Sequence, residues 1–392
     1  MAEAADAALT GPVPLKSTVM QIQHHALLSP APGTQRELVS LHYGPAEGAS
    51  AKAYIQASLH ADELPGMLVA HHLRLKLDAL ESAGRLKGEI VLVPMANPIG
   101  LSQHLLNNHH GRFEMTSGEN FNRHYPEQIA TAAANAEAEL TQDPAHNVKT
   151  LRRELQRAVI AQPVDTELQS LRRTLMGLSC DADIVLDLHC DAQAVMHLYT
   201  ETPCWPDCEP LARYLGARLT LLAQDSGDNP FDEACSQVWW KWDKHFAGRY
   251  PIPQACLAVT VELRGYVDVE HAVAEADARR IIDFLAFRGL IAGEVPAMPE
   301  AVGDARPLAG SMPIKSPVAG VLTFLRQAGE TVKAGDVLAH VIDPISATVT
   351  ELTSPVDGLL YARDSLRFAT AGMRVAKVAG REATRTGKLL GA

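Results

Sequence analysis

The segment ASLHADELPG, residues 57–66, decides how this sequence folds and where its chemistry lies. The apolar run 54–57 predicts a buried strand, and residues 64–80 have the apolar spacing of an amphipathic helix that begins with a proline. His60 and Glu63 therefore follow the carboxyl end of a strand, where open α/β sheets bind ligands. An imidazole and a carboxylate so close on a turn can hold one ion, although the same pair also occurs on solvated turns.

A second strand supplies a third candidate ligand. Residues 183–188, DIVLDL, form a short apolar run that ends in His189. If the two strand ends meet, His60, Glu63 and His189 make the two-histidine, one-glutamate set of catalytic zinc sites, which leaves a position for water. Surface or satisfied positions are the expectation for five other histidines, namely His71, His72, His104, His109 and His110.

The stretch GRFEMTSGENFNRHYP, residues 111–126, is too rich in Gly, Asn and Arg for a core element and predicts a site loop. Arg112 and Arg123 can each bind a carboxylate or polarise a carbonyl through the guanidinium, and Asn122 adds an amide donor. The alternative is an exposed loop with two ordinary arginines.

A last apolar run, residues 257–261, leads to Glu262 in VTVELRG. A carboxylate that follows such a run should be partly desolvated, so its pKa should lie above the free value, as a general base requires. The alternative is an edge-strand glutamate paired with Arg264, which is itself a candidate substrate-binding residue. Asp187 and Asp191 are the next candidates for the base.

The order and spacing of these motifs resemble the succinylglutamate desuccinylase and aspartoacylase family, in the zinc carboxypeptidase clan. The resemblance rests on LHADELPG, GRFEMTSGENFNR, LDLHCD and VELRG, and it covers about residues 50–290. It implies an α/β fold with a zinc-carboxypeptidase-like mixed sheet flanked by helices.

The resemblance also implies a role for each site residue. One zinc ion per chain would be held by His60, Glu63 and His189, with Glu262 as the proton shuttle. Arg112 would polarise the scissile carbonyl, while Asn122 and Arg123 would hold the substrate α-carboxylate.

The sequence predicts two main domains. Residues 1–300 form the catalytic α/β domain, with a helical insertion at about 128–178 that could wall the pocket or build an oligomer contact. Short strand patterns in residues 308–392 predict an all-β domain resembling a lipoyl or biotinyl barrel. The hairpin between its halves, HVIDPISATV, has no lysine to modify, so a swinging arm is disfavoured.

Composition favours a cytoplasmic globular enzyme. The 392 residues are 47% hydrophobic, and the net charge of -11 without a basic run argues against a nucleic-acid partner. The N-terminal segment 1–16 has no secretion-signal pattern, and no apolar stretch could span a membrane. Free thiols are expected for the six cysteines, Cys180, Cys190, Cys204, Cys208, Cys235 and Cys256.

The sequence thus predicts a zinc-dependent amidohydrolase that cleaves a small N-acyl amino acid, and a homo-oligomer is the default state for such an enzyme. A carboxypeptidase acting on short peptides is the alternative within hydrolases. A non-catalytic metal-binding or carrier protein is the alternative of another class. Trp239, Trp240 and Trp242 could line a pocket, but a place in the core is favoured.

Overall fold

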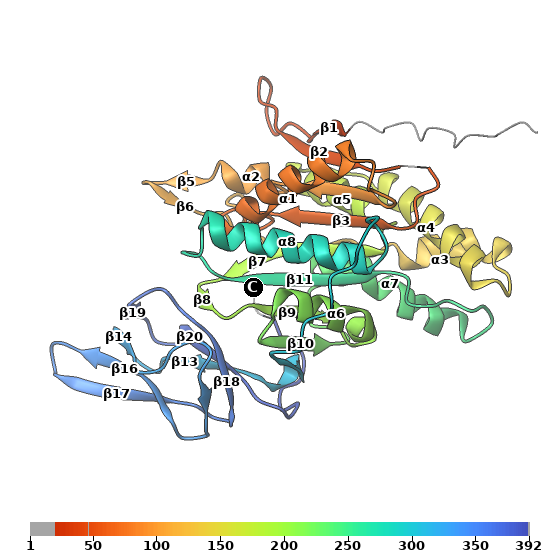
Figure 1. Cartoon of the computed structure of the whole chain (residues 1–392). Helices are drawn as coiled ribbons and strands as arrows, with labels where there is room; N and C mark the ends of the chain where they lie inside the picture. The colour runs from red at the N-terminus through yellow and green to blue at the C-terminus, as the bar shows by residue number, and fades with distance from the viewer. Residues whose placement is uncertain (1–19, 46, 391–392) are drawn as a thin grey trace, which may run out of the picture.

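The computed structural model describes residues 20–45 and 47–390, so the N-terminal segment for which we expected no secretion signal lies outside the described residues. Figure 1 shows a large sheet flanked by helices and a smaller β part, drawn in blue, formed by the C-terminal residues. The predicted mixed α/β class is therefore confirmed.

The large sheet has nine strands in the order β1-β2-β4-β3-β7-β11-β9-β10-β12. Its central strands β4, β3, β7 and β11 run parallel, whereas β1 and β2 at one edge are antiparallel, as is β9 beside β11. The carboxyl ends of β3, β7 and β11 therefore meet at one edge of the sheet. The strand bounds are β1 Gln21–Ala26, β2 Glu37–Tyr43, β3 Lys52–Ala57, β4 Glu89–Val93, β7 Ile184–Asp191, β9 His197–Glu201, β10 Leu219–Ala223, β11 Leu257–Gly265 and β12 Asp304–Pro307.

Helices cover both faces of this sheet. One apolar core lies under α1 (Pro65–Ser82), α6 (Trp205–Leu215) and α8 (His271–Phe287). A second core on the other face joins α3 (Ile129–Ala136), α4 (Pro144–Ile160), α5 (Glu167–Ser179) and α7 (Phe231–Phe246). The short helix α2 (Pro98–Leu101) and the small hairpin of β5 (His104–Leu105) and β6 (Asn108–His109) complete this part.

Several expected elements differ in detail from the structure. The strand predicted at 183–188 continues to Asp191, so His189 lies within β7 and not after it. The strand extends this far because His189 pairs with Glu262 of β11. Because β11 lies between β7 and β9, the edge-strand reading of Glu262 is wrong. Trp239 and Trp242 are fully buried, as expected for core residues.

The C-terminal part consists of two small antiparallel sheets around its own apolar core. One sheet has the order β13-β20-β18-β15 and the other β17-β16-β14-β19. The N-terminal part adds β8 (Gln193–Ala194) to β18, which ties the two parts together. The bounds are β13 Ser311–Lys315, β14 Gly320–Phe324, β15 Thr331–Val332, β16 Val337–Asp343, β17 Thr348–Thr353, β18 Gly358–Arg363, β19 Phe368–Ala369 and β20 Arg374–Ala379.

Two further observations concern the described part of the chain. All six cysteines are buried and none forms a disulfide. No helix there is both long and apolar enough to cross a membrane.

Candidate metal centre and active site

The turn after β3 carries two of the candidate ligands. Ser58 adopts a left-handed φ of 68°, a conformation that costs energy for a residue with a side chain and is typical of functional turns. His60 accepts a backbone hydrogen bond from Glu63 (3.1 Å), which closes the turn just before α1. At Gly66 a Cβ would lie 2.9 Å from the Leu188 carbonyl oxygen, so glycine lets α1 approach β7 closely.

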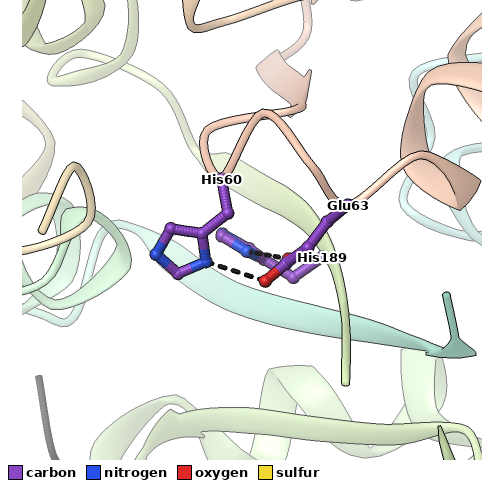
Figure 2. A group of neighbouring side chains, drawn as sticks. All are labelled: His60, Glu63 and His189. Atoms are coloured by element: carbon purple, nitrogen blue, oxygen red, sulfur yellow. Dashed lines mark hydrogen bonds and ion pairs between the residues drawn. The ribbon is translucent and has the colours of Figure 1, made fainter. Parts of the chain in front are cut away.

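His60, Glu63 and His189 converge in the folded protein, as Figure 2 shows. The Nδ1 atom of His60 lies 2.9 Å from one Glu63 carboxylate oxygen, and the Nδ1 atom of His189 lies 2.7 Å from the other. All three side chains are at most 3% exposed, and their candidate ligand atoms lie within 4.8 Å of one another.

Two outer residues fix the orientation of the imidazoles. The Oδ1 atom of Asn120 accepts the backbone N–H of Asn122 (2.8 Å), so it must also act as the acceptor for Nε2–H of His60 at 2.9 Å. Asp187 lies 2.9 Å from Nε2 of His189 and accepts its proton. Both Nδ1 atoms are thereby directed toward Glu63, and such outer partners are usual around metal-binding histidines.

The electrostatics of the three residues are strongly perturbed. Burial, and then the nearby Arg112, lower the pKa of His60 to about 4. Burial alone would raise the pKa of Glu63, but His60 and His189 hold it well below its usual value. Burial alone would lower the pKa of His189, but Asp187 and Glu63 raise it well above the usual value.

This donor set suits a metal ion. A neutral His60 that donates from Nε2 presents the lone pair of Nδ1 to a Glu63 oxygen, so two acceptors face each other at 2.9 Å. The guanidinium of Arg112 lies 3.2 Å from both atoms and can satisfy them, and a metal ion bound by the same lone pairs would do so as well. Two imidazole nitrogens and one carboxylate form a recognised catalytic zinc set, so the residues present fit such an ion.

Arg112 and Glu262 flank the candidate ligands. The Nη1 atom of Arg112 lies 3.2 Å from both His60 Nδ1 and a Glu63 oxygen. Burial, together with Glu63 and Asp191, raises the pKa of Glu262 to about 8, as the sequence led us to expect. One Glu262 oxygen is buried without a hydrogen-bond partner among the described residues.

A cavity of about 590 Å³ lies beside this cluster, with His60, Arg112, His189 and Glu262 among its lining residues. Two further predicted site residues, Asn122 and Arg123, also line this cavity.

The segment that carries this pair is tightly held. Asn122 accepts a hydrogen bond from the backbone N–H of Phe231 (2.8 Å) at the start of α7. Arg123 is 6% exposed and donates to the Asn122 carbonyl (2.6 Å). The structure does not bring Arg264 to the cavity, since its guanidinium pairs with Asp277 of α8.

The helical insertion supports the site loop from outside. Arg172 of α5 donates to the Glu119 carboxylate (2.8 Å) and to the Asn120 carbonyl (3.1 Å). At Gly111 a Cβ would lie 2.2 Å from the backbone nitrogen of Asp62, so only glycine allows this loop to pack on the ligand turn. No residue of 128–178 lines the cavity, so the expectation that the insertion walls the pocket is wrong.

Sequence reasoning missed two kinds of site residue. Asn120 was not singled out, and Asp187 was considered only as a further candidate for the base; the need of a ligand histidine for an outer acceptor could have identified the role of both. Lys377 of β20 pairs with Asp191, and Arg374 of the same strand lines the cavity. Nothing in the local sequence connects these two residues with His189, about 190 positions earlier, or with His60 and Glu63, more than 300 positions earlier.

Solved structures share this architecture over nearly the whole chain. A succinylglutamate desuccinylase/aspartoacylase family protein from Shewanella amazonensis SB2B is 27% identical with a TM-score of 0.80, covering 92% of this chain and 98% of its own. A protein of the same description from Shewanella frigidimarina NCIMB 400 is 25% identical with a TM-score of 0.79, over 93% and 98% of the two chains. No curated protein matches the sequence significantly.

The fold and the site define an α/β protein with a candidate His–Glu–His metal centre at the carboxyl ends of its central strands. Residues 49–168 match the model of the succinylglutamate desuccinylase/aspartoacylase catalytic domain. Together with the Shewanella structures, this match confirms the resemblance to that family seen in the sequence.

Proposed function

We propose that the protein is a zinc-dependent hydrolase that cleaves the amide bond of N-acyl amino acids. One observation carries the proposal: His60, Glu63 and His189 converge beside Arg112 and Glu262 in a single cavity. A zinc ion held by the three ligands would supply Lewis-acid activation of water and of the scissile carbonyl.

The flanking residues have complementary tasks in this reaction. Glu262 accepts a proton from the attacking water and then delivers it to the leaving amine, and its raised pKa suits both steps. Arg112 donates to the negative oxygen that forms on the carbonyl carbon, which stabilises the tetrahedral state. Because Arg112 is anchored by Glu63, its guanidinium is positioned before the substrate binds.

The cavity favours an anionic substrate. It is lined by seven Lys and Arg residues against four Asp and Glu residues, although the whole chain has a net charge of -11. We assign the α-carboxylate of the amino acid to Asn122 and Arg123, because both line this cavity and its local excess of positive charge would attract that group.

Metal analysis combined with a substrate screen tests the proposal. Purified protein should hold one zinc ion per chain, and it should hydrolyse some members of a panel of N-acetyl, N-succinyl and N-aroyl amino acids. Purified protein that holds no metal and hydrolyses no member of the panel would contradict the proposal. Faster cleavage of long peptides than of any acyl amino acid would favour the carboxypeptidase alternative.

The α-carboxylate site has its own test. Arg123→Lys keeps the charge but loses the planar fork, so KM should rise by an amount equivalent to about 1.5–3 kcal/mol. Amidation of the substrate carboxylate should cost the native enzyme a similar amount and the variant much less. Equal losses in both enzymes would contradict the assignment.

The cytoplasmic location and the homo-oligomeric state stay predictions, which cell fractionation and light scattering test.

A further inference from the structure

Arg112 and Glu262 lie at the junction of two cavities. The first is the cavity of about 590 Å³ described above, and the second has a volume of about 690 Å³. Four residues line both: Arg112, Glu262, Arg374 and Lys377. A bond that is cleaved at this junction therefore has space on each side.

The two cavities differ in what they can bind. Asn122 and Arg123 line only the first, so the proposed α-carboxylate lies there and the acyl group points into the second. Each cavity is of the size that encloses a drug-sized ligand, for which about 300–1,000 Å³ is typical. An acetyl group would fill only a small part of the second cavity.

The charges of the two cavities also differ. The lining of the first has three more positive than negative side chains, whereas the second has four Lys and Arg residues and four Asp and Glu residues. Two of the latter residues, Lys377 and Asp191, form an ion pair with each other. Glu262 lines both cavities, so its protonation does not change this difference: the second cavity has three fewer net positive charges than the first and attracts an anionic acyl group less.

Apolar groups from both parts of the protein border this second cavity. Tyr266 follows β11, while Leu366, in the loop after β18, is 60% exposed. Val375 and Ala376 of β20 add smaller apolar surfaces. The cavity forms only because the C-terminal part is docked here, through the Ala362 to Ala194 pairing of β18 with β8.

We propose that the second cavity is the acyl site and that it takes a bulky, uncharged acyl group, with Leu366 and Tyr266 as specificity-determining residues. The inference rests on the proposed deacylase function and names its substrate class. Medium-chain aliphatic and aromatic acyl groups have the required size and lack of charge. A carboxylate-bearing acyl group such as succinyl gains nothing from this lining.

An acyl series on one amino acid tests the inference. The amino acid whose acyl derivatives are cleaved fastest in the screen is chosen first. Its N-acetyl, N-succinyl, N-octanoyl and N-benzoyl derivatives are then compared by kcat/KM. We expect octanoyl or benzoyl to exceed acetyl by about 10-fold or more, since each added apolar contact favours the larger group. Succinyl should not exceed acetyl.

Variants connect the selectivity with this cavity. Leu366→Asp adds a charge to the apolar border and should lower the octanoyl-to-acetyl ratio about 10-fold. Ser365→Trp, which places a bulky side chain in the same cavity, should lower it as well. The matched control is Ile345→Asp, at a 96% exposed position of the same domain that lines neither cavity, and it should leave the ratio unchanged.

Two results would overturn the inference while the deacylase function stands. One is cleavage of the acetyl derivative with kcat/KM falling steadily as the acyl group grows. The other is an octanoyl-to-acetyl ratio that Leu366→Asp and Ser365→Trp both leave unchanged. Failure to cleave any acyl amino acid by zinc-loaded protein would overturn the deacylase function itself.

Discussion

At the scale of single residues, the candidate metal centre depends on two groups that contact its histidines and are not themselves candidate ligands. Asn120 and Asp187 each accept a hydrogen bond from the Nε2–H of one histidine and so direct both Nδ1 atoms toward Glu63. The hydrogen bond from the Asn122 backbone leaves the Asn120 oxygen only the role of acceptor. The orientation of the ligands is therefore set before an ion binds.

The first prediction concerns the ligands. His60→Ala and His189→Ala should each lose bound zinc and activity together, since two remaining donors hold the ion far more weakly. Circular dichroism and thermal unfolding should still report a folded protein. Its Tm should fall by no more than the loss of the stabilisation that zinc binding gives the native state. Stoichiometric zinc in both purified variants would refute the ligand assignment.

The second prediction concerns Glu262. Glu262→Gln should keep zinc and lower kcat by roughly 100-fold to 10,000-fold, the usual contribution of a general base. Burial raises the pKa of Glu262, so native activity should rise with pH through a limb above the ordinary carboxyl range, because the base must first lose its proton. That limb should be missing from the pH profile of the variant. Near-normal turnover would instead transfer the base role to another carboxylate.

At the scale of elements, the helical insertion contacts the site loop through Arg172 of α5. The guanidinium of Arg172 joins α5 to the side chain of Glu119 and the backbone of Asn120, and it also lies over the Tyr125 ring at 6.0 Å. The insertion thus holds the loop that orients His60, even though none of its residues lines the cavity.

The third prediction tests this support. Arg172→Lys cannot make both hydrogen bonds, so the free energy of unfolding should fall by about 1–3 kcal/mol. Zinc affinity should fall by about 10-fold or more, as for other outer-residue changes. Arg173→Lys, one position along α5 and bonded only to the Gln162 carbonyl, serves as the control. Equal effects from both substitutions would show that α5 as a whole, and not this contact, supports the site.

At the scale of the whole molecule, the C-terminal part completes the site. Lys377 crosses the domain boundary to pair with Asp191, two residues after a candidate ligand. Burial alone would raise the pKa of Asp191, but Lys377 holds it at about 2. An apolar cluster that includes Tyr199 and Tyr361 seals the same boundary.

The fourth prediction concerns this ion pair. Lys377→Met should lower the free energy of unfolding by about 1–3 kcal/mol. This loss is smaller than for a fully buried ion pair, because Lys377 is partly exposed. The pKa of Asp191 is lower in the native state than in the unfolded chain, where it is about 4. The ion pair therefore stabilises the native state fully above about pH 4, and this stabilisation is lost as the pH falls toward 2. Urea denaturation between pH 2 and 6 should therefore show that the free energy of unfolding falls less on acidification in the variant than in the native protein. Parallel curves would contradict a stabilising role for the pair.

The sequence by itself determined the parts of this protein that depend on local pattern. Apolar periodicity predicts β3, α1, β7 and β11, because a strand or helix must bury one face wherever it lies. The same patterns place His60, Glu63, His189 and Glu262 at or near strand ends, and parallel pairing then brings them together. The all-β character of the C-terminal part also follows from its short strands and turn glycines, whereas its division into two sheets is seen only in the structure.

Only the tertiary structure decided which distant residues share the site. Local sequence is silent on Lys377 beside Asp191, on Arg172 beneath Asn120, and on the second cavity, because each depends on the docking of segments remote in sequence. Tertiary packing also keeps Arg264 of β11 out of the cavity, because its guanidinium pairs with Asp277 of α8. Strand pattern fixes which residues reach an edge of the sheet, but the packing of whole domains fixes what they meet there.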